Sequence, residues 1–415
     1  QAGPDRPAVT PIARADGPAG TAAISANRAC PQLRRLAGRG NSRAGLQVRN
    51  LRSGKLVCAL HAGTMRSLAS NTKIFTTATA LARLGPGHRL RTRLHADGRL
   101  DGNGTLHGSL YLRGGGDPSL GTDEFLSRYL AGAGSSIEKL AAKAKRAGIR
   151  RVTGRLYGDD GVFDRLRGVA DSGYATSPWI GPLSGLSFNA GFTSPSLSRF
   201  SSDPAKLATK TLGRALRARG IALKEQIGMK RTPAAARKRL IARQVAPDMA
   251  WMARVTNLNS NNFFAEMTLK NVGAAVRKDG TTAGGAKVVK RYAKSQGVKV
   301  HPVDGSGLTV TNRSNPKGVV RLLMRARKKP WGEAFVDSLP VAGRDGTLAS
   351  RMRGSAAEGR CHAKTGTLTG VSALSGYCFN ASGRGYAFSI LMNGVRDSYA
   401  ARLAQDRIAA LIARL

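Results

Sequence analysis

The sequence predicts an α+β protein in which a mixed α/β domain is inserted into a discontinuous domain built on an antiparallel sheet. The chain has 415 residues, 41% of them hydrophobic, which is enough for two domains with substantial cores. Strand-like segments lie near both ends of the chain, whereas the middle mixes short strands with amphipathic helices. We therefore expect the early and late strands to share one sheet flanked by helices.

The expected domain boundaries follow changes in composition. Residues 1–28 begin with a stretch rich in Pro, Gly and Ala and predict a flexible N-terminal arm. Residues 29–90 and 250–415 carry the early and late strands, and we expect them to form the sheet-bearing domain. Residues 91–249 are the expected inserted domain.

The early elements are two strands and a helix. Residues 44–63 predict two strands joined by an Arg-Ser-Gly turn at residues 52–54. A helix of mostly uncharged residues begins at Ser70 and ends near the stop signal Gly-Pro-Gly at residues 85–87.

The expected insertion alternates strands and helices. Residues 105–120 predict a strand that ends in a glycine loop, and residues 150–160 predict a second strand. Residues 135–149 and 203–221 predict amphipathic helices. The glycine loop lacks the Lys-Ser/Thr pair of a phosphate-binding P-loop, so we expect a plain turn there.

The late elements complete the sheet-bearing domain. Residues 248–273 predict two helices separated by a polar break at residues 257–262, and residues 284–297 predict another helix. Three strands and a terminal helix follow, at residues 360–368, 372–380, 384–394 and 398–415. We expect the apolar stripe of the terminal helix to pack on the preceding sheet rather than on a membrane surface.

The chain is strongly basic, with 67 Lys and Arg against 24 Asp and Glu and a formal net charge of +43. Such a charge favours anionic partners, among them anionic cell-wall polymers. The basic residues are spread along the whole chain and aromatic residues make up only 5% of it, so we expect no specific nucleic-acid site. No apolar run is long enough to predict a transmembrane segment.

The four cysteines are Cys30, Cys58, Cys361 and Cys378. None of them forms a C-x-x-C pair, so the sequence predicts no zinc site. Cys361 and Cys378 lie symmetrically about residues 369–370, and they face each other if this segment is an antiparallel hairpin. The residues alone leave disulfides and buried thiols both open.

The pattern S-x-x-K occurs three times, at residues 70–73, 136–139 and 314–317. The last two are explained by helix starts, whereas Ser70 precedes a helix suited to a domain interior. At this spacing the Ser70 and Lys73 side chains share a helix face, with Cβ atoms ~5–6 Å apart. Ser70 is therefore a candidate nucleophile, Lys73 its base, and the Ser70 N–H half of an oxyanion hole.

The sequence K-T-G occurs once, on a strand expected at the edge of the sheet. Lys364 adds a positive field that lowers the pKa of Lys73, and Thr365 adds a hydrogen bond to a substrate carboxylate. Gly366 lets a substrate backbone approach, and the N–H of Thr367 completes the oxyanion hole.

A third element has the form S-x-N, which occurs at Ser187/Asn189 and Ser260/Asn262. The first lies in a segment that predicts a plain loop. The second lies in the polar break between two predicted helices, so we favour Ser260 for proton relay and Asn262 for holding the substrate amide.

In this order, SNTK, SNN and KTG resemble the motifs of active-site serine penicillin-binding proteins and serine β-lactamases. The wider segments "LYLRGGGDPSL", "GRLYGDDGVFD", "DGSGLTVTNRSNP", "AGRDGTLASRMRG" and "AKTGTLTGVSALSGY" resemble the D-alanyl-D-alanine carboxypeptidase/endopeptidase family, the class C low-molecular-mass penicillin-binding proteins of peptidase family S13. The resemblance runs from about residue 40 to the C-terminus.

The resemblance implies a serine β-lactamase/transpeptidase-like catalytic domain with an insertion between S-x-x-K and S-x-N. The two motif serines are separated by 190 positions, a wider gap than β-lactamases have. Family members with three domains carry a further β-rich module, for which this chain has little room, so we expect two domains. Asn261 stands where the family often has aspartate.

The resemblance also implies roles in acyl transfer. Ser70 attacks the carbonyl of the penultimate D-Ala of a peptidoglycan stem peptide, and Lys73 accepts its proton. Ser260, linked to Lys364, passes a proton to the leaving D-Ala nitrogen. Asn262 holds the amide on the acyl side.

The remaining implied roles concern substrate binding. Lys364 and Thr365 bind the terminal carboxylate, and the strand continues through Gly366. The N–H groups of Ser70 and Thr367 stabilise the oxyanion. Water then hydrolyses the acyl-enzyme without a cofactor or metal, and β-lactams acylate Ser70 to leave a slow ester.

Two alternatives remain on this scaffold. A serine β-lactamase is disfavoured by the wide insertion, and a non-catalytic cell-wall-binding protein is compatible with the basic charge. A Ser-His-Asp triad is disfavoured because no G-x-S-x-G is present. His362 shares the strand face of Lys364 and is a candidate subsite residue. The implied substrate predicts an extracytoplasmic location, which favours disulfides.

Overall fold

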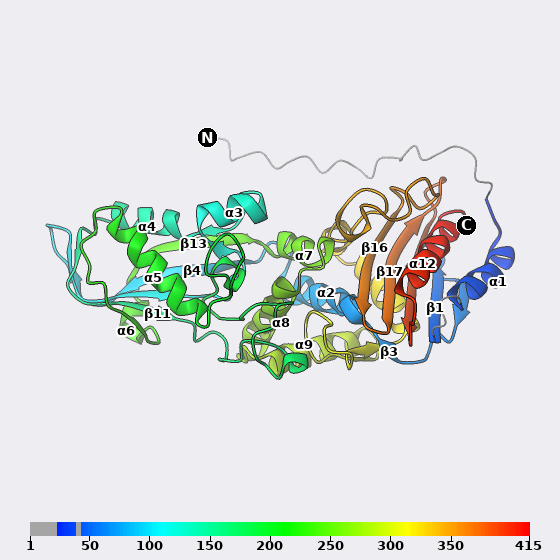
Figure 1. Ribbon diagram of the computed structural model, residues 1–415, viewed down its shortest axis with the longest axis horizontal. Helices are drawn as coiled ribbons and strands as arrows, with labels where there is room; N and C mark the ends of the chain where they lie inside the picture. The colour runs from blue at the N-terminus through cyan, green and yellow to red at the C-terminus, as the bar shows by residue number, and fades with distance from the viewer. Residues whose placement is uncertain (1–22, 39–42) are drawn as a thin grey trace.

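Two five-stranded sheets lie at opposite ends of an elongated molecule (Figure 1). The structure is a computed structural model that describes residues 23–38 and 43–415. Residues 1–22 of the predicted arm lie outside the described residues, and the helix that follows begins at Ala26. Within the described residues, no helix has the length and apolar character needed to span a membrane.

The first sheet joins strands from both ends of the sequence. Its strands are β1 (Arg43–Asn50), β2 (Leu56–Leu60), β16 (Cys361–Leu368), β17 (Val371–Phe379) and β18 (Gly385–Asn393). Their order is β16-β17-β18-β1-β2, and every neighbouring pair is antiparallel. Arg43 lies opposite Asn393. The expected antiparallel sheet of early and late strands is confirmed, with β16 at its edge.

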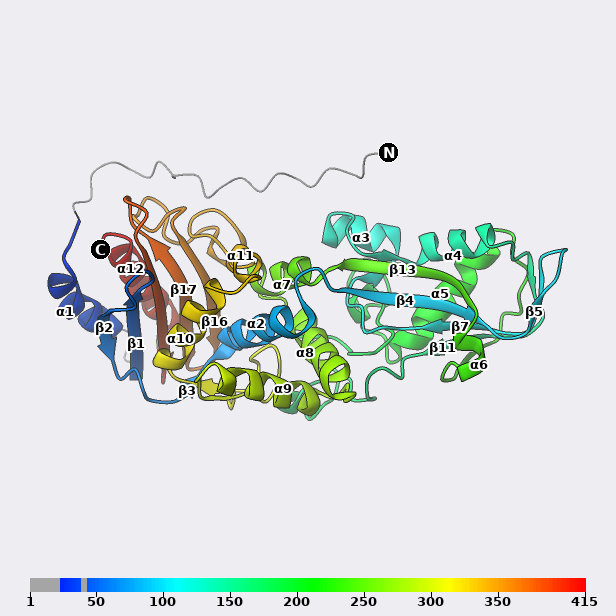
Figure 2. The same ribbon diagram turned by 180° about the vertical axis from the view of Figure 1, so that it is seen from behind.

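Helices cover both faces of this sheet (Figures 1 and 2). They are α1 (Ala26–Ala37), α2 (Thr72–Leu84), α10 (Pro316–Arg327) and α12 (Ser398–Ile412). α1 and α12 share an apolar cluster with Phe388, and α2 and α10 share another with Leu391. The expected packing of the terminal helix on the sheet is confirmed. The segments just outside these helices also meet: the N–H of Ile24, before α1, donates to the O of Arg414, after α12, at 3.0 Å.

A further group of helices lies between the two sheets and beside α2 (Figure 2). These are α7 (Met249–Leu258), α8 (Asn262–Arg277), α9 (Thr282–Ser295) and α11 (Gly332–Asp337). α8 packs against α2 on one side and α9 on another. The break between α7 and α8 falls at residues 259–261, inside the polar segment that the sequence indicated.

The second sheet is mixed. Its strands are β4 (Arg89–Ala96), β7 (Leu110–Arg113), β11 (Leu156–Asp159), β12 (Ile227–Met229) and β13 (Leu240–Asp248), in the order β12-β11-β7-β4-β13. The helices α4 (Ile137–Arg146) and α5 (Pro204–Arg217) share its apolar cluster. The chain enters through β4 and leaves through β13, with Arg89 opposite Asp248. For this reason we propose residues 91–249 as a separate inserted domain.

Shorter elements connect these layers. They are β3 (Arg66–Ser67), β5 (Arg99–Leu100), β6 (Thr105–His107), β8 (Leu120–Gly121), α3 (Asp123–Leu130), β9 (Ser135–Ser136), β10 (Arg151–Val152), α6 (Ala234–Arg237), β14 (Val300–His301) and β15 (Arg313–Ser314), with 3₁₀ turns η1 (Ala69–Asn71), η2 (Ala170–Ser172), η3 (Asn189–Gly191) and η4 (Gly346–Leu348).

The strand predicted at residues 105–120 is divided into β6 and β7, whereas the glycine loop predicted after it is present between β7 and β8. The chain turns between β6 and β7 at Gly108. An added Cβ at Gly108 would lie 2.4 Å from Asp97 O, so only glycine allows this approach of the two backbones.

Both cysteine pairs are disulfides. Cys30 joins Cys58, and Cys361 joins Cys378, with S–S distances of 2.09 and 2.01 Å. Cys361 lies directly opposite Cys378 in the β16–β17 hairpin, which turns at residues 369–370. The hairpin interpretation is therefore confirmed, and the alternative of buried thiols is excluded for all four cysteines.

Candidate active site

Ser70 lies in η1, the short 3₁₀ turn directly before α2. The preceding residue, Ala69, has a φ of 45°, a left-handed conformation that costs a non-glycine residue about 1–2 kcal/mol. Gly307 accommodates this turn, since an added Cβ there would lie 1.9 Å from Ala69 O. Ser70 is partly exposed between buried Ala69 and Asn71. The strained turn thus presents one hydroxyl at the start of a buried helix.

The Lys73 amine is fully buried and has three neighbours. Its Nζ lies 2.9 Å from Ser70 Oγ, 2.7 Å from Asn262 Oδ1 and 2.6 Å from Ser306 O. A neutral amine has two N–H bonds and one lone pair. Asn262 and Ser306 offer only acceptors, so they take the two N–H bonds and leave the lone pair facing the Ser70 hydroxyl.

The charge state of this amine is set by its surroundings. Burial lowers the pKa of Lys73 to about 7, although the nearby carboxylates of Asp304 and Glu266 act in the opposite direction. A substantial neutral fraction is therefore present near neutral pH. This satisfies the condition under which lysine acts as a general base.

Two buried carboxyl groups support the lysine, and the sequence did not identify them. Glu266, on α8, accepts hydrogen bonds from the backbone N–H groups of Gly305 and Ser306, which holds Ser306 O against Lys73. Burial and the neighbouring Asp304 raise the pKa of Glu266 to about 7. The signal that was available is the segment "DGSGLTVTN", in which Asp304 starts a tight loop.

Asp304 fixes the shape of that loop. Its carboxylate accepts hydrogen bonds from the N–H groups of Gly307 and Thr309 and from the side chain of Asn312. Burial raises the pKa of Asp304 above its usual range. The loop is also held to α2, because Thr76 donates to the carbonyl of Gly305 at 2.8 Å.

Lys364 lies on β16 and is also fully buried. Burial lowers its pKa well below the usual value, and the positive charge of Lys73 lowers it further. Its Nζ donates to Thr365 O at 3.0 Å, and its own carbonyl accepts from Asn71 Nδ2 at 3.0 Å. β16 is thereby tied to η1. The pKa of Lys73 is set by burial against Asp304 and Glu266, so the expected lowering by Lys364 is not observed.

At Gly366 the strand β16 lies close to η1 and to the residue before it. An added Cβ would lie 3.0 Å from Leu68 O, 3.1 Å from Ser70 N and 3.2 Å from Asn71 N. All three atoms belong to the backbone. The glycine therefore allows the edge strand to lie directly against the turn that carries the hydroxyl.

The backbone of β16 turns an N–H group toward this junction. The N–H of Ala363 donates to Pro340 O on the side away from β17. Because orientation repeats every second residue along a strand, the N–H groups of Thr365 and Thr367 also point away from β17. Thr367 is exposed, and the Thr365 hydroxyl bonds that of Thr347 at 2.9 Å.

Asn262 connects Lys73 with residues 91–249, which we propose as the inserted domain. It is the first residue of α8, whose N-terminus is capped by Asn261 accepting the N–H of Phe264 at 3.0 Å. The Oδ1 atom of Asn262 faces Lys73, and its Nδ2 donates to Trp179 O at 3.0 Å. The cap explains why asparagine at the middle position of S-x-N suits this site.

Ser260 lies beside the site but does not make the expected link. Its φ of 55° places it in a left-handed turn between α7 and α8. Lys364 Nζ donates to Thr365 O instead, and in the part of the chain that the structure describes no hydrogen bond joins Ser260 Oγ to Lys364.

The alternative motifs lie elsewhere. Ser136 caps α4 by accepting the N–H of Lys139 at 3.0 Å, as expected. Ser314 donates to Lys299 O and lies on β15. Asn189 accepts from the N–H of Thr122 in the second part of the molecule.

His362 packs its ring edge against Phe379, with the ring centres 6.2 Å apart. Burial lowers the pKa of His362. The structure gives this histidine a packing contact away from the Ser70 hydroxyl.

The site motifs are matched by a similarity over most of the chain. The sequence matches the D-Ala-D-Ala carboxypeptidase 3 (S13) family over residues 32–202 and 193–415.

Two curated relatives are similar at 30% identity. One is a D-alanyl-D-alanine carboxypeptidase of Actinomadura sp. strain R39, aligned over 87% of this chain and 81% of the relative. The other is carboxypeptidase DacB of Mycolicibacterium smegmatis, aligned over 83% of this chain and 74% of the relative.

Solved structures show the same fold at lower identity. Penicillin-binding protein 4 (dacB) of Haemophilus influenzae has a TM-score of 0.76 and 21% identity, covering 92% of this chain and 97% of that one. The Bd0816 predatory endopeptidase of Bdellovibrio bacteriovorus has a TM-score of 0.56 and 21% identity, covering 89% and 92%. The α+β transpeptidase-like fold is confirmed by these neighbours.

Proposed function

The chain belongs to the D-Ala-D-Ala carboxypeptidase 3 (S13) family, and from this premise we propose that it cleaves peptidoglycan stem peptides through an acyl-enzyme on Ser70. Membership makes the chain a hydrolase of the DD-carboxypeptidase type. The observation that carries the specific proposal is the buried Lys73 amine. Its Nζ lies 2.9 Å from Ser70 Oγ, on the side that Asn262 and Ser306 leave free.

Acylation begins with proton transfer. Neutral Lys73 accepts the proton of Ser70 as Oγ attacks the carbonyl carbon of the penultimate D-Ala. The bond from oxygen to carbon forms, and the electrons of the carbonyl move to its oxygen. Asn262 and Ser306 keep the lysine lone pair aimed at the hydroxyl throughout, because both accept its N–H bonds.

The oxyanion forms where η1 meets β16. The N–H of Ser70 lies at this junction, within 3.1 Å of the position that a Cβ on Gly366 would take. The N–H of Thr367 points from the sheet edge on the same side. We assign these two donors to the developing negative charge, which fixed backbone dipoles stabilise without reorganisation.

The terminal carboxylate of the substrate is assigned to Lys364 and Thr365. The Thr365 hydroxyl now bonds Thr347 and is partly exposed, so it can turn to a carboxylate oxygen. Lys364 is buried beside it, and a bound carboxylate would favour the protonated form of this lysine, against the effect of burial. Asn262 is assigned to the amide on the acyl side, where its Nδ2 exchanges Trp179 O for a substrate carbonyl.

The leaving nitrogen receives its proton through Ser260. This assignment requires Ser260 Oγ to bond a lysine Nζ when substrate is present, and catalytic hydrogen bonds often shorten only in the substrate complex. The C–N bond then breaks and D-Ala leaves. Water attacks the ester, Ser70 is released, and no metal or cofactor takes part in the scheme.

β-Lactams are the second class of ligand in the proposal, since they resemble the D-Ala-D-Ala end. One neighbouring structure of Haemophilus influenzae penicillin-binding protein 4 is described as complexed with a novel β-lactam. We infer that the protein acts outside the cytoplasm, where peptidoglycan lies. Two disulfides support this location, because such bonds persist in oxidising compartments.

The deciding measurement is intact mass after incubation with benzylpenicillin. The wild-type protein is expected to gain one penicilloyl group, and Ser70→Ala is expected to gain none. Ser136→Ala is the matched control, because it changes the serine of another S-x-x-K motif and should leave the adduct intact. Absence of an adduct on the wild-type protein contradicts the proposal and favours a non-catalytic wall-binding protein.

A kinetic comparison separates the proposal from a β-lactamase. Release of D-Ala from a D-Ala-D-Ala peptide is expected to be faster than hydrolysis of penicillin. The same peptide assay with a cross-linked substrate reports whether the protein also acts as a DD-endopeptidase. Faster turnover of penicillin than of the peptide is the result that a β-lactamase would give.

A further inference from the structure

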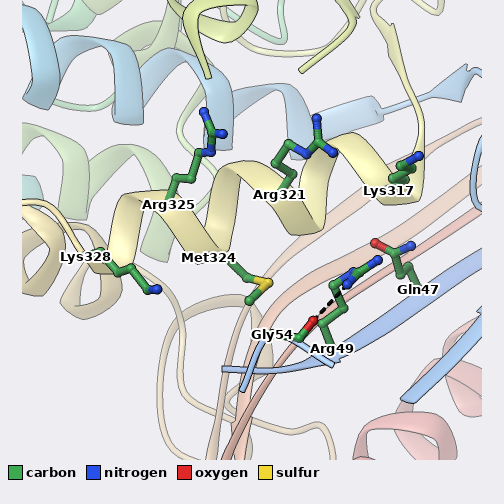
Figure 3. A pocket seen from close by; sticks show the side chains of 8 residues that line it. All are labelled: Gln47, Arg49, Gly54, Lys317, Arg321, Met324, Arg325 and Lys328. Carbon is green, nitrogen blue, oxygen red and sulfur yellow. Dashed lines mark hydrogen bonds between the residues drawn. The ribbon is translucent and has the colours of Figure 1, made fainter. Parts of the chain in front are cut away.

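A basic cavity lies between α10 and β1, three strands away from the catalytic edge β16 (Figure 3). Its volume is about 270 Å³. Five cationic side chains and no acidic one line it: Arg49, Lys317, Arg321, Arg325 and Lys328. Such a concentration of positive charge in a concave surface attracts anions strongly, because the low-dielectric walls focus the field.

One buried polar group in this cavity has no partner. Gln47 is 3% exposed, lines the cavity, and its Oε1 makes no hydrogen bond. Figure 3 shows its amide on the same strand face as Arg49, below α10. A buried acceptor left unpaired costs about 1–3 kcal/mol. Because Oε1 is the buried atom, the Nε2 end of the same amide is the one that can offer N–H bonds to an anion in the cavity.

A second hollow continues around the β1–β2 turn. It has a volume of about 680 Å³, and residues 49–54 line one or other of the two hollows. Its cationic residues are Arg52, Arg327 and Arg384, again without an acidic neighbour in the lining. The two hollows have separate linings that adjoin along residues 49–54. We name them together the α10 groove and define it by the cationic side chains of both hollows together with Gln47.

The cations along α10 are regularly spaced. Lys317, Arg321 and Arg325 follow one another at intervals of four residues and are all exposed. Residues at this interval share a helix face and are separated by about 6 Å along the axis. A regular row of cations suits a polymer with regularly repeated anions better than it suits one small ion.

We propose that the α10 groove binds an extended polyanion whose repeating group is a phosphodiester. Each such group carries several acceptor oxygens, which arginine forks and the Gln47 amide can share. A flat bilayer is a poorer fit because Gln47 lies at a depth that leaves it 3% exposed. Nucleic acid is a poorer fit because bases stack on aromatic rings, and Phe379, the aromatic residue of the lining, is already covered. The guanidinium of Arg327 lies 5.1 Å from its ring centre.

The position of the groove gives it a use. A polymer held there leaves β16 and Ser70 free, since β17, β18 and part of β1 lie between the two places. An anionic wall polymer would thus retain the enzyme beside its substrate. This use rests on the proposed function, whereas binding itself does not.

The test measures binding of linear inorganic polyphosphate to the full chain by calorimetry at several NaCl concentrations. The double substitution Lys317→Glu/Arg325→Glu is expected to lower affinity by about tenfold or more at low salt. The matched control is Lys206→Glu/Lys210→Glu, which makes the same charge change on the exposed face of α5. It is expected to lower affinity by about twofold, through the net charge alone. Equal losses of affinity in the two variants would contradict the proposal that polyphosphate binds in the α10 groove.

A second variant tests the built part of the site. Gln47→Leu keeps the charge and removes the amide, so affinity is expected to fall severalfold while the unfolding temperature is unchanged or higher. Unchanged affinity would reduce the groove to diffuse surface charge and overturn the proposal. Tighter binding of phosphatidylglycerol vesicles or polyglutamate than of polyphosphate would replace the phosphate polymer by that class, and tighter binding of oligothymidine would identify the phosphodiester polymer as nucleic acid. Penicillin labelling of Ser70 in every variant reports the proposed function separately.

Discussion

At the scale of single residues, the buried amine of Lys73 is central to the proposed chemistry. Lys73 has no exposed surface, and its three neighbours are a hydroxyl, an amide oxygen and a backbone carbonyl. None of these neighbours carries a negative charge. The carboxylates of Glu266 and Asp304 act from farther away through the loop that they hold.

The pH dependence of acylation follows from this environment. The base must be neutral, and the pKa of Lys73 is lowered to about 7. The penicillin acylation rate is therefore expected to rise with pH through a midpoint near that value, measured by stopped-flow labelling. Lys73→Arg keeps the charge but removes the base and should slow labelling by about 100-fold or more. Lys139→Arg is the control, and a flat pH profile would exclude lysine as the base.

Glu266 gives a second prediction with a definite sign. Its charge favours the protonated form of Lys73, so Glu266→Gln removes that support and lowers the pKa of Lys73 further. The rising limb of the acylation profile is then expected at lower pH than in the wild-type protein. The maximum rate should also fall, because a glutamine holds the Gly305 and Ser306 N–H groups less firmly. An unmoved midpoint would show that Glu266 has only a structural role.

Local spacing accounts for what the sequence could predict at this scale. Ser70 and Lys73 are one helical turn apart, so their contact followed from helix geometry. Glu266 and Asp304 are distant in sequence and meet only through folding, and each resembles an ordinary surface acid in the linear chain. Their role was therefore missed. The link of Ser260 to Lys364 depended on side-chain rotation, which spacing does not determine.

At the scale of elements, the contact between β16 and η1 assembles the site. Gly366 allows the edge strand to approach the backbone of Leu68, Ser70 and Asn71. In the proposed mechanism this contact brings the N–H of Thr367 and the side chain of Lys364 to the same site as Ser70. In the proposed mechanism, a shift of this strand would separate the two assigned oxyanion donors without changing any side chain assigned to catalysis.

Gly366→Ala tests this contact. The added methyl group meets three backbone atoms at 3.0–3.2 Å, so β16 must move away from η1. We expect a loss of stability of about 1–3 kcal/mol and a fall in penicillin labelling of about 100-fold. Gly87→Ala is the control, because nothing lies within 4 Å of its Cβ position. Wild-type labelling in Gly366→Ala would show that the contact is not needed.

Elements were predicted well where a pattern spans the whole element. The β16–β17 hairpin followed from the symmetric positions of Cys361 and Cys378, and the terminal helix from its apolar stripe. The division of residues 105–120 into separate strands was missed. It depends on the close contact of Gly108 with the backbone of Asp97, which a sequence pattern does not reveal. Composition showed the glycine but not the neighbour that required it.

At the scale of the whole molecule, an apolar cluster joins α8 to the inserted part. Phe263 and Met267 of α8 pack with Phe163 and Leu183. Beside them Lys270 Nζ, with no exposed side-chain surface, pairs with Asp164 Oδ1 at 2.5 Å. Because α8 begins at Asn262, this junction supports one of the three neighbours of Lys73.

Breaking the pair should loosen the junction. Asp164→Asn leaves the buried Lys270 charge without its partner, which is expected to cost about 3 kcal/mol of unfolding free energy. Denaturant unfolding measures the loss. Asp101→Asn, in the exposed pair of Asp101 with His107, is the control and should leave stability unchanged. Equal stability of the two variants would mean that water already compensates Lys270.

The strands of the first sheet come from opposite ends of the sequence. The helices α1 and α12, which pack on this sheet, lie close to the two described ends of the chain. Ile24 and Arg414 are joined by a backbone hydrogen bond. A short linker could therefore fuse these ends, while new termini are opened at the exposed turn of residues 102–103. Such a circularly permuted protein would begin and finish far from the Ser70 hydroxyl, which makes that turn a convenient place to attach a reporter.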